Sequence, residues 1–520
     1  MGRLGHCDAR IGTRRHSRDC MDHVLTGARM NQKIAVSAVY VAAMFVSILD
    51  ATIVNVALPT LGRAFGVPAT SVDTVAIYYL VSLAVFIPAS GWLGDRFGGK
   101  RVLLTAIVVF TAASALCGAA TSLTALEIFR IVQGLGGGML APVGLAMLLR
   151  MFPPEERIRM AGLLTVPTTL APAIGPVLGG LLVTEASWRW VFYVNVPLGA
   201  AALLFGLLFL EDGTQQRPGR FDVVGFALAG AGFGALMYGV SEGPVTGWDS
   251  AAVLATIAAG LVILAILARA ELAHERPLID MRLLRNRLFR SCSGVMVLAS
   301  VAFIGSLYLA SLFFQDGRGL SALGSGLSTF PEAFGVMLGA QLASRVLYPM
   351  LGPRRHIALG LAGVMTTIAL MALIGAATSL WWMRALMFAM GFMQGQVFVP
   401  SQGAAFATIS REASGRASTM FNAGRQLGGA AGVALLTTAV VAVGASHAVG
   451  RGSGKEGAAA GRVLPNLTAY HAGFLLAAAV DAVAVLVALT IRDADAAATI
   501  PARRGRRLAR PGGGTAAEEA

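Results

Sequence analysis

The sequence predicts an all-α membrane protein that crosses the bilayer many times. Of its 520 residues, 56% are hydrophobic and only 13% are charged, and the mean hydropathy is +0.70. A soluble globular protein carries about 25% charged residues, so this chain has too few to cover a surface that faces water. Its apolar runs are long and unbroken, whereas a membrane β-barrel alternates over segments of about 10 residues. No stretch of ordinary composition is long enough for a large soluble catalytic domain, so we expect no enzyme.

Fourteen apolar segments follow one another, each close to the roughly 20 residues that a spanning helix needs. They cover residues 34–58, 72–93, 102–121, 123–149, 160–183, 190–210, 222–241, 250–268, 288–314, 322–347, 356–377, 380–406, 415–443 and 470–491. The first run, from Ile34, is too long for the apolar core of a secretory signal. We therefore expect no signal peptide, and Met30 is a candidate start.

The basic residues indicate how the chain is oriented. Of the 41 lysines and arginines, 32 fall on the side of the predicted membrane that holds both termini, 7 fall on the other side and 2 lie within spans. Basic residues collect on the cytoplasmic side, so both termini are expected there. The net charge of +14 therefore reflects orientation, and we expect no nucleic-acid partner. The basic tail 492–520 is expected to be a disordered tether that contacts anionic lipid headgroups.

The four cysteines, Cys7, Cys20, Cys117 and Cys292, imply no disulfide framework, since two lie in apolar segments and two in the amino-terminal tail. A metal site in that tail would have to use His6, Cys7, His16, Cys20 and His23. Their spacing matches no tight ligand pattern, and no metal is predicted. The chain also has no G-x-x-x-x-G-K-[ST] phosphate loop, which argues against ATP as the energy source.

Two ionisable residues, Asp50 and Arg130, stand out because they lie inside apolar segments. A charge within the membrane is costly and is by default a candidate functional group. At 1.5 Å per residue, Asp50 lies about 12 Å and Arg130 about 10 Å below the same side of the membrane. They can pair if the first and fourth spans adjoin, either as a proton site or as a static ion pair that holds the two helices together.

Several motifs resemble those of the major facilitator superfamily, and within it the fourteen-span drug:proton antiporters. The residues that carry this resemblance are Leu49–Pro59, Gly91–Arg101, Arg130 with Gln133 and Gly134, Pro167–Gly180 and Trp188–Gly199. The resemblance covers about residues 34–491. One departure is Gly99, where the superfamily often has a basic residue, although Lys100 and Arg101 follow at once.

The resemblance implies two six-helix bundles, 34–210 and 288–491. Two inserted helices and a linker, 211–287, lie between the bundles. The cytoplasmic amino-terminal tail, 1–33, precedes them, and the basic carboxy-terminal tail, 492–520, follows them. The resemblance also implies a substrate cavity at the bundle interface and alternating access by rocking. Asp50 is then expected to carry the proton, with Arg130 setting its affinity for it. Asp95 and Arg96 are expected to latch the bundles on the cytoplasmic side, the alternative being a solvated loop acid.

In the fifth span, small residues and prolines recur every four positions and make one face of the helix small and its backbone pliable. The resemblance implies that this span acts as a gate. The residues concerned are Pro167, Gly175, Pro176, Gly179 and Gly180. Candidates for the substrate cavity are polar or charged residues in apolar segments, namely Asn55, Gln133, Gln315, Glu332, Gln394, Asn422 and Arg425.

The expected function is proton-coupled export of lipophilic or amphipathic drugs, without a cofactor, by a monomer in the bacterial plasma membrane. A bacterial source is indicated by the excess of arginine over lysine and by abundant Ala and Gly. The alternatives are a dedicated exporter of one metabolite or lipid, a membrane sensor, and a membrane-embedded transferase. A transferase would need clustered acids, histidines or metal ligands in an outer loop, and the longest such loop, 444–469, has none.

Overall fold

The computed structural model describes residues 31–67, 72, 74–211, 221–273, 277–375, 377–444, 446–448 and 463–499. Each of the fourteen predicted segments is helical in it. Ten of the described helices are by themselves long and apolar enough to cross a membrane. The chain is thus a multi-pass, all-helical membrane protein, and the count of fourteen spans stays a prediction. The predicted metal set and candidate start in the amino-terminal tail, and the arginine cluster of the other tail, lie outside the described residues.

The first bundle contains the helices before residue 210. They are α2 (Gln32–Phe65), α4 (Thr74–Phe97), α5 (Gly99–Ala119), α6 (Leu123–Met151), α7 (Pro154–Glu185), α8 (Trp190–Tyr193) and α9 (Asn195–Phe209). Local sequence explains their ends. The Asn31 side chain accepts from Lys33 N at the start of α2, and Gly66, with φ of 66°, ends that helix in the left-handed conformation. Pro154 opens α7, where a missing N–H costs nothing.

The second bundle contains the helices after residue 286. They are α12 (Arg287–Leu312), α13 (Ala322–Thr329), α14 (Pro331–Leu342), α15 (Tyr348–Met371), α16 (Leu380–Ala405), α17 (Ser414–Val443) and α18 (Leu467–Leu489), with π-helical segments η2 (Phe313–Gly317) and η3 (Ala343–Leu347). The predicted segment 322–347 is divided at Pro331, which begins α14. Gly352, with φ of 74°, bends α15 near its start.

Two inserted helices connect the bundles. They are α10 (Val223–Thr246) and α11 (Ala251–Ala273), followed by the short helix η1 (Met281–Arg285). Helix α10 packs against α4 of the first bundle and α17 of the second, and α11 packs on α10. The Trp248 indole donates to Thr438 Oγ1 over 2.5 Å and ties the α10–α11 loop to α17.

Ordered structure continues beyond the last predicted span. The predicted disordered tail begins at residue 492, but Asp493–Thr499 forms the 3-10 helix η4. It is held because Arg354 N donates to Asp493 Oδ1 over 2.8 Å and because the Tyr348 and Thr499 hydroxyls lie 2.6 Å apart. The tail prediction is therefore wrong for these seven residues.

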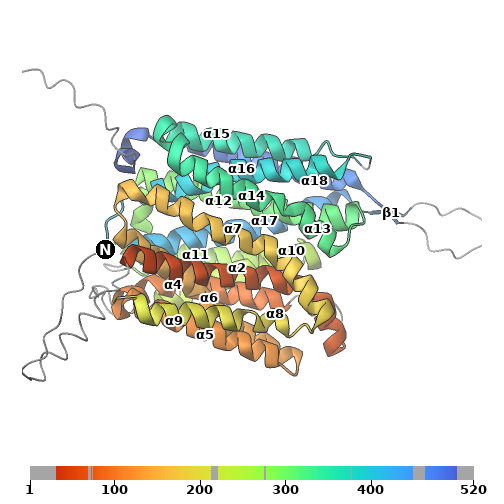
Figure 1. Ribbon diagram of the computed structural model, residues 1–520, viewed down its shortest axis with the longest axis horizontal. Helices are drawn as coiled ribbons and strands as arrows, with labels where there is room; N and C mark the ends of the chain where they lie inside the picture. Colours follow the sequence, from red (N-terminus) through yellow and green to blue (C-terminus); the bar gives the residue numbers. More distant parts are fainter. Residues whose placement is uncertain are drawn as a thin grey trace, which may run out of the picture.

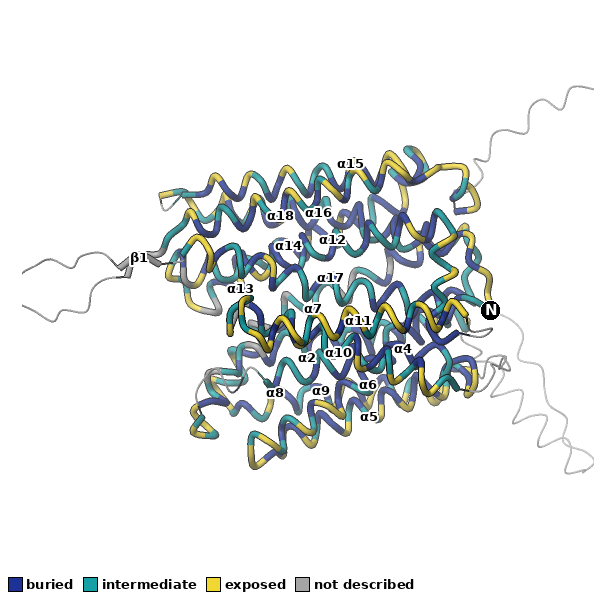
Figure 2. Tube along the Cα trace, turned by 180° about the vertical axis from the view of Figure 1, so that it is seen from behind, coloured by how far each residue is buried: buried dark blue, intermediate teal, exposed yellow. Residues whose placement is uncertain are grey.

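Figure 1 shows the helices running roughly side by side, with α15 at one edge of the molecule and α5 and α9 at the other. We call the end at which α2 begins the basic end, because the loops there carry more arginines than the loops at the opposite end. At the opposite end, strands β1 (Ser446–Ala448) and β2 (Val463–Pro465) pair antiparallel, with His447 opposite Leu464. Helices at the periphery carry exposed residues (Figure 2), and on α11 these include Leu254, Leu261 and Ile266, as expected of a lipid-facing surface.

Candidate functional site

Glycines in α6 bring three helices of the first bundle into close contact. A Cβ at Gly134 would lie 2.6 Å from Tyr79 O in α4, and one at Gly136 would lie 2.7 Å from Phe110 N in α5. Only glycine permits backbones to approach so closely. These contacts hold Arg130 and Gln133, on the same helix, against α4 and α5.

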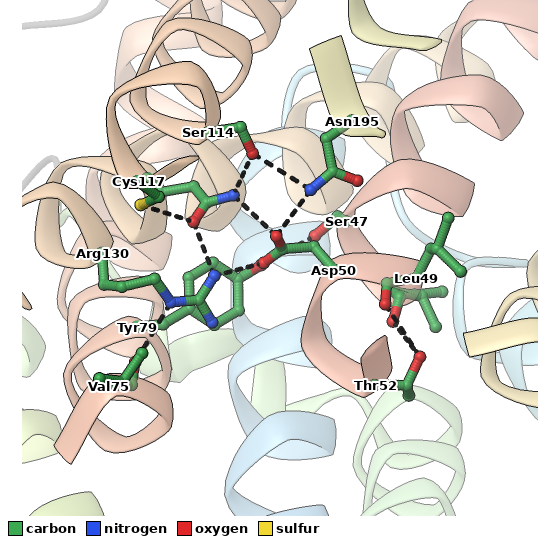
Figure 3. A network of polar contacts seen from close by, with 12 residues as sticks. Ser47, Leu49, Asp50, Thr52, Val75, Tyr79, Ser114, Cys117, Arg130 and Asn195 are labelled. Carbon is green, nitrogen blue, oxygen red and sulfur yellow. Dashed lines mark hydrogen bonds and ion pairs between the residues drawn. The ribbon is translucent and has the colours of Figure 1, made fainter. Parts of the chain in front are cut away.

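The Asp50 carboxylate is the centre of a buried polar network (Figure 3). Arg130 Nη1 donates to Oδ2 over 2.6 Å, while Gln133 Nε2 and Asn195 Nδ2 donate to Oδ1 over 2.9 and 2.7 Å. Ser114 Oγ accepts from the same two amides over 2.6 and 3.1 Å. Three N–H donors, one of them from a positively charged guanidinium, thus converge on a single carboxylate.

Hydrogen bonds and a cation–π contact fix the Arg130 side chain. Its Nε donates to Val75 O over 3.2 Å and its Nη1 to Gln133 Oε1 over 2.6 Å. The guanidinium carbon lies 4.2 Å from the centre of the Tyr79 ring, a cation–π distance, and the Tyr79 hydroxyl is 3.2 Å from Ser47 Oγ. Asp50 is 0% and Arg130 1% exposed, so the pair is sealed from bulk water.

Sequence reasoning identified Asp50, Arg130 and Gln133, and the structure brings all three together. It missed Asn195, Ser114 and Tyr79 as members of the network. Asn195 lies in the stretch Trp188–Gly199 that carried the family resemblance, so a signal was present. Its Oδ1 is buried without a hydrogen-bond partner among the described residues, which leaves one acceptor in the site unused.

Three glycines in the second half of α7 differ in how closely a neighbouring helix approaches them. A Cβ at Gly179 would lie 2.9 Å from Ile53 Cγ1, and one at Gly175 would lie 2.9 Å from Thr52 Cβ, so both glycines pack against α2 within five residues of Asp50. Gly180 has no such neighbour within 4 Å. Pro167 and Pro176 lie in α7, and Asn55 lies in α2, but their side chains fall outside the described part of the chain.

At the basic end, Asp95 forms an ion pair with Arg150, which lies at the end of α6 in the same bundle. Arg150 Nε in turn donates to Ser414 Oγ, at the start of α17, over 3.3 Å. Asp95 is thus connected to the second bundle through Arg150, which sequence reasoning did not single out. Arg96 is exposed and forms no ion pair with the described residues, so its predicted latch role has no support in this geometry.

Among the described residues, four further side-chain hydrogen bonds cross between the bundles, and each lies toward the basic end. Ser418 Oγ donates to Pro142 O over 2.9 Å, and the Ser90 and Thr419 hydroxyls are 3.3 Å apart. Gln341 Nε2 donates to Gly162 O over 2.8 Å. The buried guanidinium of Arg157 donates to the O atom of Phe406, the residue that follows α16, and, over 3.1 Å, to Leu149 O. The two bundles are therefore joined at this end.

The remaining cavity candidates are separate from the Asp50 network. Gln315 is exposed, and its Nε2 contacts Ser311 O at 3.4 Å. Gln394 is fully buried without a partner among the described residues, and Asn422 Nδ2 donates to Ser418 O over 2.9 Å. Glu332 is 5% exposed, and Arg425 is half-buried.

Two helical bundles joined at one end, with a buried acid–arginine network in one of them, form an arrangement typical of membrane transporters. The Major Facilitator Superfamily model matches residues 40–433, and the chain belongs to this superfamily. It is 32% identical over 406 residues to a multidrug resistance protein B homolog of Mycobacterium tuberculosis, covering 77% of this chain and 75% of that one. It is 31% identical to the transporter YhcA of Bacillus subtilis over 79% of this chain and 78% of that one. A putative multidrug resistance protein MdtD of Klebsiella pneumoniae is 33% identical over 68% of this chain and 74% of its own length.

Solved structures agree on the fold. The human transporter MFSD10 superposes with a TM-score of 0.62 at 15% identity, covering 88% of this chain and all of that one. The proton:xylose symporter XylE superposes with a TM-score of 0.57 at 14% identity, covering 88% and 94%. At such low identity the similarity establishes the major facilitator fold, which the sequence predicted, and nothing about substrate.

Proposed function

We propose that this protein is a proton-coupled antiporter that exports lipophilic or amphipathic drugs from the bacterial cytoplasm by alternating access. The observation that carries the proposal is the Asp50 network. The Asp50 carboxylate is 0% exposed, is paired with Arg130 and accepts hydrogen bonds from two amides. Placing an ionisable group within the membrane costs free energy, and a functional role would explain why the chain keeps one there. The multidrug relatives support the choice of drugs as substrates.

In this proposal the carboxylate gains a proton when the surrounding helices open and admit water, and releases it when the network closes again. Separation from the Arg130 guanidinium removes the charge that favours the anion. Helix α7 packs on α2 next to Asp50 through Gly175 and Gly179, so a movement of α7 reaches this site. The basic end then faces the cytoplasm, with both termini, and the bundles are joined there in an outward-facing state.

The proton gradient supplies enough free energy for export. A proton that moves down 100 mV releases about 2.3 kcal/mol, and each pH unit adds about 1.36 kcal/mol. One proton per cycle then sustains a substrate ratio of a few hundredfold. We propose no cofactor and a monomer as the working unit.

The test is transport by the purified protein in liposomes. In liposomes where the basic end of the protein faces the outer solution, an acidic lumen should drive accumulation of amphipathic dyes inside, and adding substrate to the outer solution should release protons from the lumen. Response to many unrelated compounds supports a multidrug exporter, whereas response to one compound supports the dedicated metabolite or lipid exporter. A protein that moves no solute under any gradient would favour a sensor.

A further inference from the structure

Helix α17 presents one face to the first bundle. Ser414 accepts from Arg150 Nε and Ser418 donates to Pro142 O, so both contact α6. Arg425 follows Ser418 by seven residues, a spacing that keeps it on the same face. At 1.5 Å per residue, it lies about 10 Å farther from the basic end than Ser418.

Arg425 therefore lies at the interface between the bundles. The ionisable group that acts on it electrostatically is the phenol of Tyr40 in α2, across the interface. The Tyr40 ring itself packs against α6, where a Cβ at Gly144 would lie 3.1 Å from Tyr40 Cε2. Arg425 thus lies on the face of α17 that contacts α6, near enough to Tyr40 of α2 to interact with it electrostatically.

No carboxylate in the described part of the chain forms an ion pair with Arg425. Among the described residues it takes part in no ion pair and no hydrogen bond, whereas Arg130 is paired with Asp50. Two buried acids of the second bundle lie on other helices: Glu332 on α14 and Asp481 on α18. Neither forms an ion pair with Arg425, and Tyr40 is neutral at physiological pH.

An arginine in the membrane is costly unless its charge is compensated, and its planar group of donors suits carboxylate, sulfonate and phosphate oxygens. We propose that Arg425 binds an anionic group of the transported molecule, so that the preferred substrates are amphipathic anions. This inference rests on the proposed function for the route of transport but concerns the substrate class alone. In each cycle the substrate supplies the negative charge that Arg425 lacks in this structure.

The test uses three compounds with the same ring and different charge: 2-naphthalenesulfonate, neutral 2-naphthalenesulfonamide and 2-naphthyltrimethylammonium. Binding to the full-length protein in lipid nanodiscs is measured by equilibrium dialysis. The sulfonate should bind most tightly to the wild type. Arg425→Gln should raise its Kd by about tenfold to a hundredfold, the range expected when a charged hydrogen-bond partner is lost, and should leave the sulfonamide unchanged. Arg425→Lys, which keeps the charge, should fall between them.

Arg290→Gln is the matched control, because it removes the same charge from an exposed side chain at the basic end. The proposal is overturned if the ammonium compound binds the wild type more tightly than the sulfonate, a comparison that does not depend on how a variant folds. It is also overturned if Arg425→Gln leaves the sulfonate Kd within about twofold, or if Glu332→Gln, rather than Arg425→Gln, abolishes binding. Failure of the proposed function is distinguishable: the sulfonate would still bind through Arg425, but no pH gradient would move any of the three compounds.

Discussion

Arg130 Nη1 and Asp50 Oδ2 lie 2.6 Å apart although eighty positions separate the two residues in the sequence. Helix α6 supplies the arginine and α2 the acid, and neither side chain is more than 1% exposed. Breaking such a pair leaves one charge buried without a partner, which is costlier than never having had the pair. This asymmetry gives the first prediction.

Arg130→Gln should destabilise the protein by about 3 to 5 kcal/mol, because Asp50 loses its counter-charge inside the bundle. The double variant Asp50→Asn/Arg130→Gln removes both charges and should be more stable than Arg130→Gln alone. Thermal unfolding in detergent, followed by far-UV circular dichroism, measures the order. A double variant that is less stable than either single variant would contradict this account of the pair.

Gly179 and Gly180 of α7 allow a matched pair of substitutions one residue apart. Gly179→Ala should impair drug efflux by several-fold, since its Cβ would lie 2.9 Å from Ile53 Cγ1 and 3.1 Å from Ile53 O next to the acid site. Gly180→Ala, with nothing within 4 Å, should retain near wild-type efflux. Uptake of a fluorescent substrate by inverted vesicles compares the two, and equal effects would refute the α2–α7 contact as the cause.

The link from Asp95 through Arg150 to Ser414 should favour the state in which the basic end is closed. Arg150→Gln breaks both contacts and should raise the labelling rate of a cysteine introduced at Ala146, a buried position one turn away. Arg96→Gln removes an exposed side chain without an ion pair to the described residues and should change that rate much less. Mass spectrometry after timed exposure to a thiol reagent gives both rates. Similar labelling rates for the two variants would contradict the claim that Arg150, by connecting Asp95 to Ser414, favours the closed state.

Arg157 and Arg159 test the second connection between the bundles. The Arg157 guanidinium is buried and donates to a carbonyl of α6 and to the carbonyl of the residue that follows α16, so Arg157→Gln leaves buried acceptors unsatisfied and should cost about 1 to 3 kcal/mol. Arg159 is exposed, and Arg159→Gln should cost less than about 0.5 kcal/mol. Thermal unfolding in detergent gives both values. Equal losses of stability in the two variants would mean that the hydrogen bonds from Arg157 to these carbonyls do not stabilise the contact between the bundles.

The sequence could predict the parts of the site that depend on position along a helix. Asp50 and Arg130 stand out as charges in apolar segments, and counting residues from the membrane edge gives them matching depths. The partners of Asp50 depend instead on how helices pack sideways, which one sequence does not reveal. Asn195 begins α9 one residue after the short helix α8, and Ser114 is an ordinary residue in an apolar span.

The same limit explains the basic end. Asp95 was recognisable from its motif, but Arg150 looked like one more basic residue at a cytoplasmic edge. Only the approach of α17 gives it a partner in the second bundle. The order of Asp493–Thr499 was also missed, because the contacts that hold this short segment come from Tyr348 and Arg354, elsewhere in the chain.

The central claim is that Asp50 carries the proton, and one comparison tests it most directly. Asp50→Asn keeps the size of the side chain but removes its titration. In liposomes, this variant should retain exchange of labelled for unlabelled substrate without a gradient, and should lose both substrate-stimulated proton release and accumulation driven by a pH gradient. Proton release by Asp50→Asn at the wild-type rate would contradict the account.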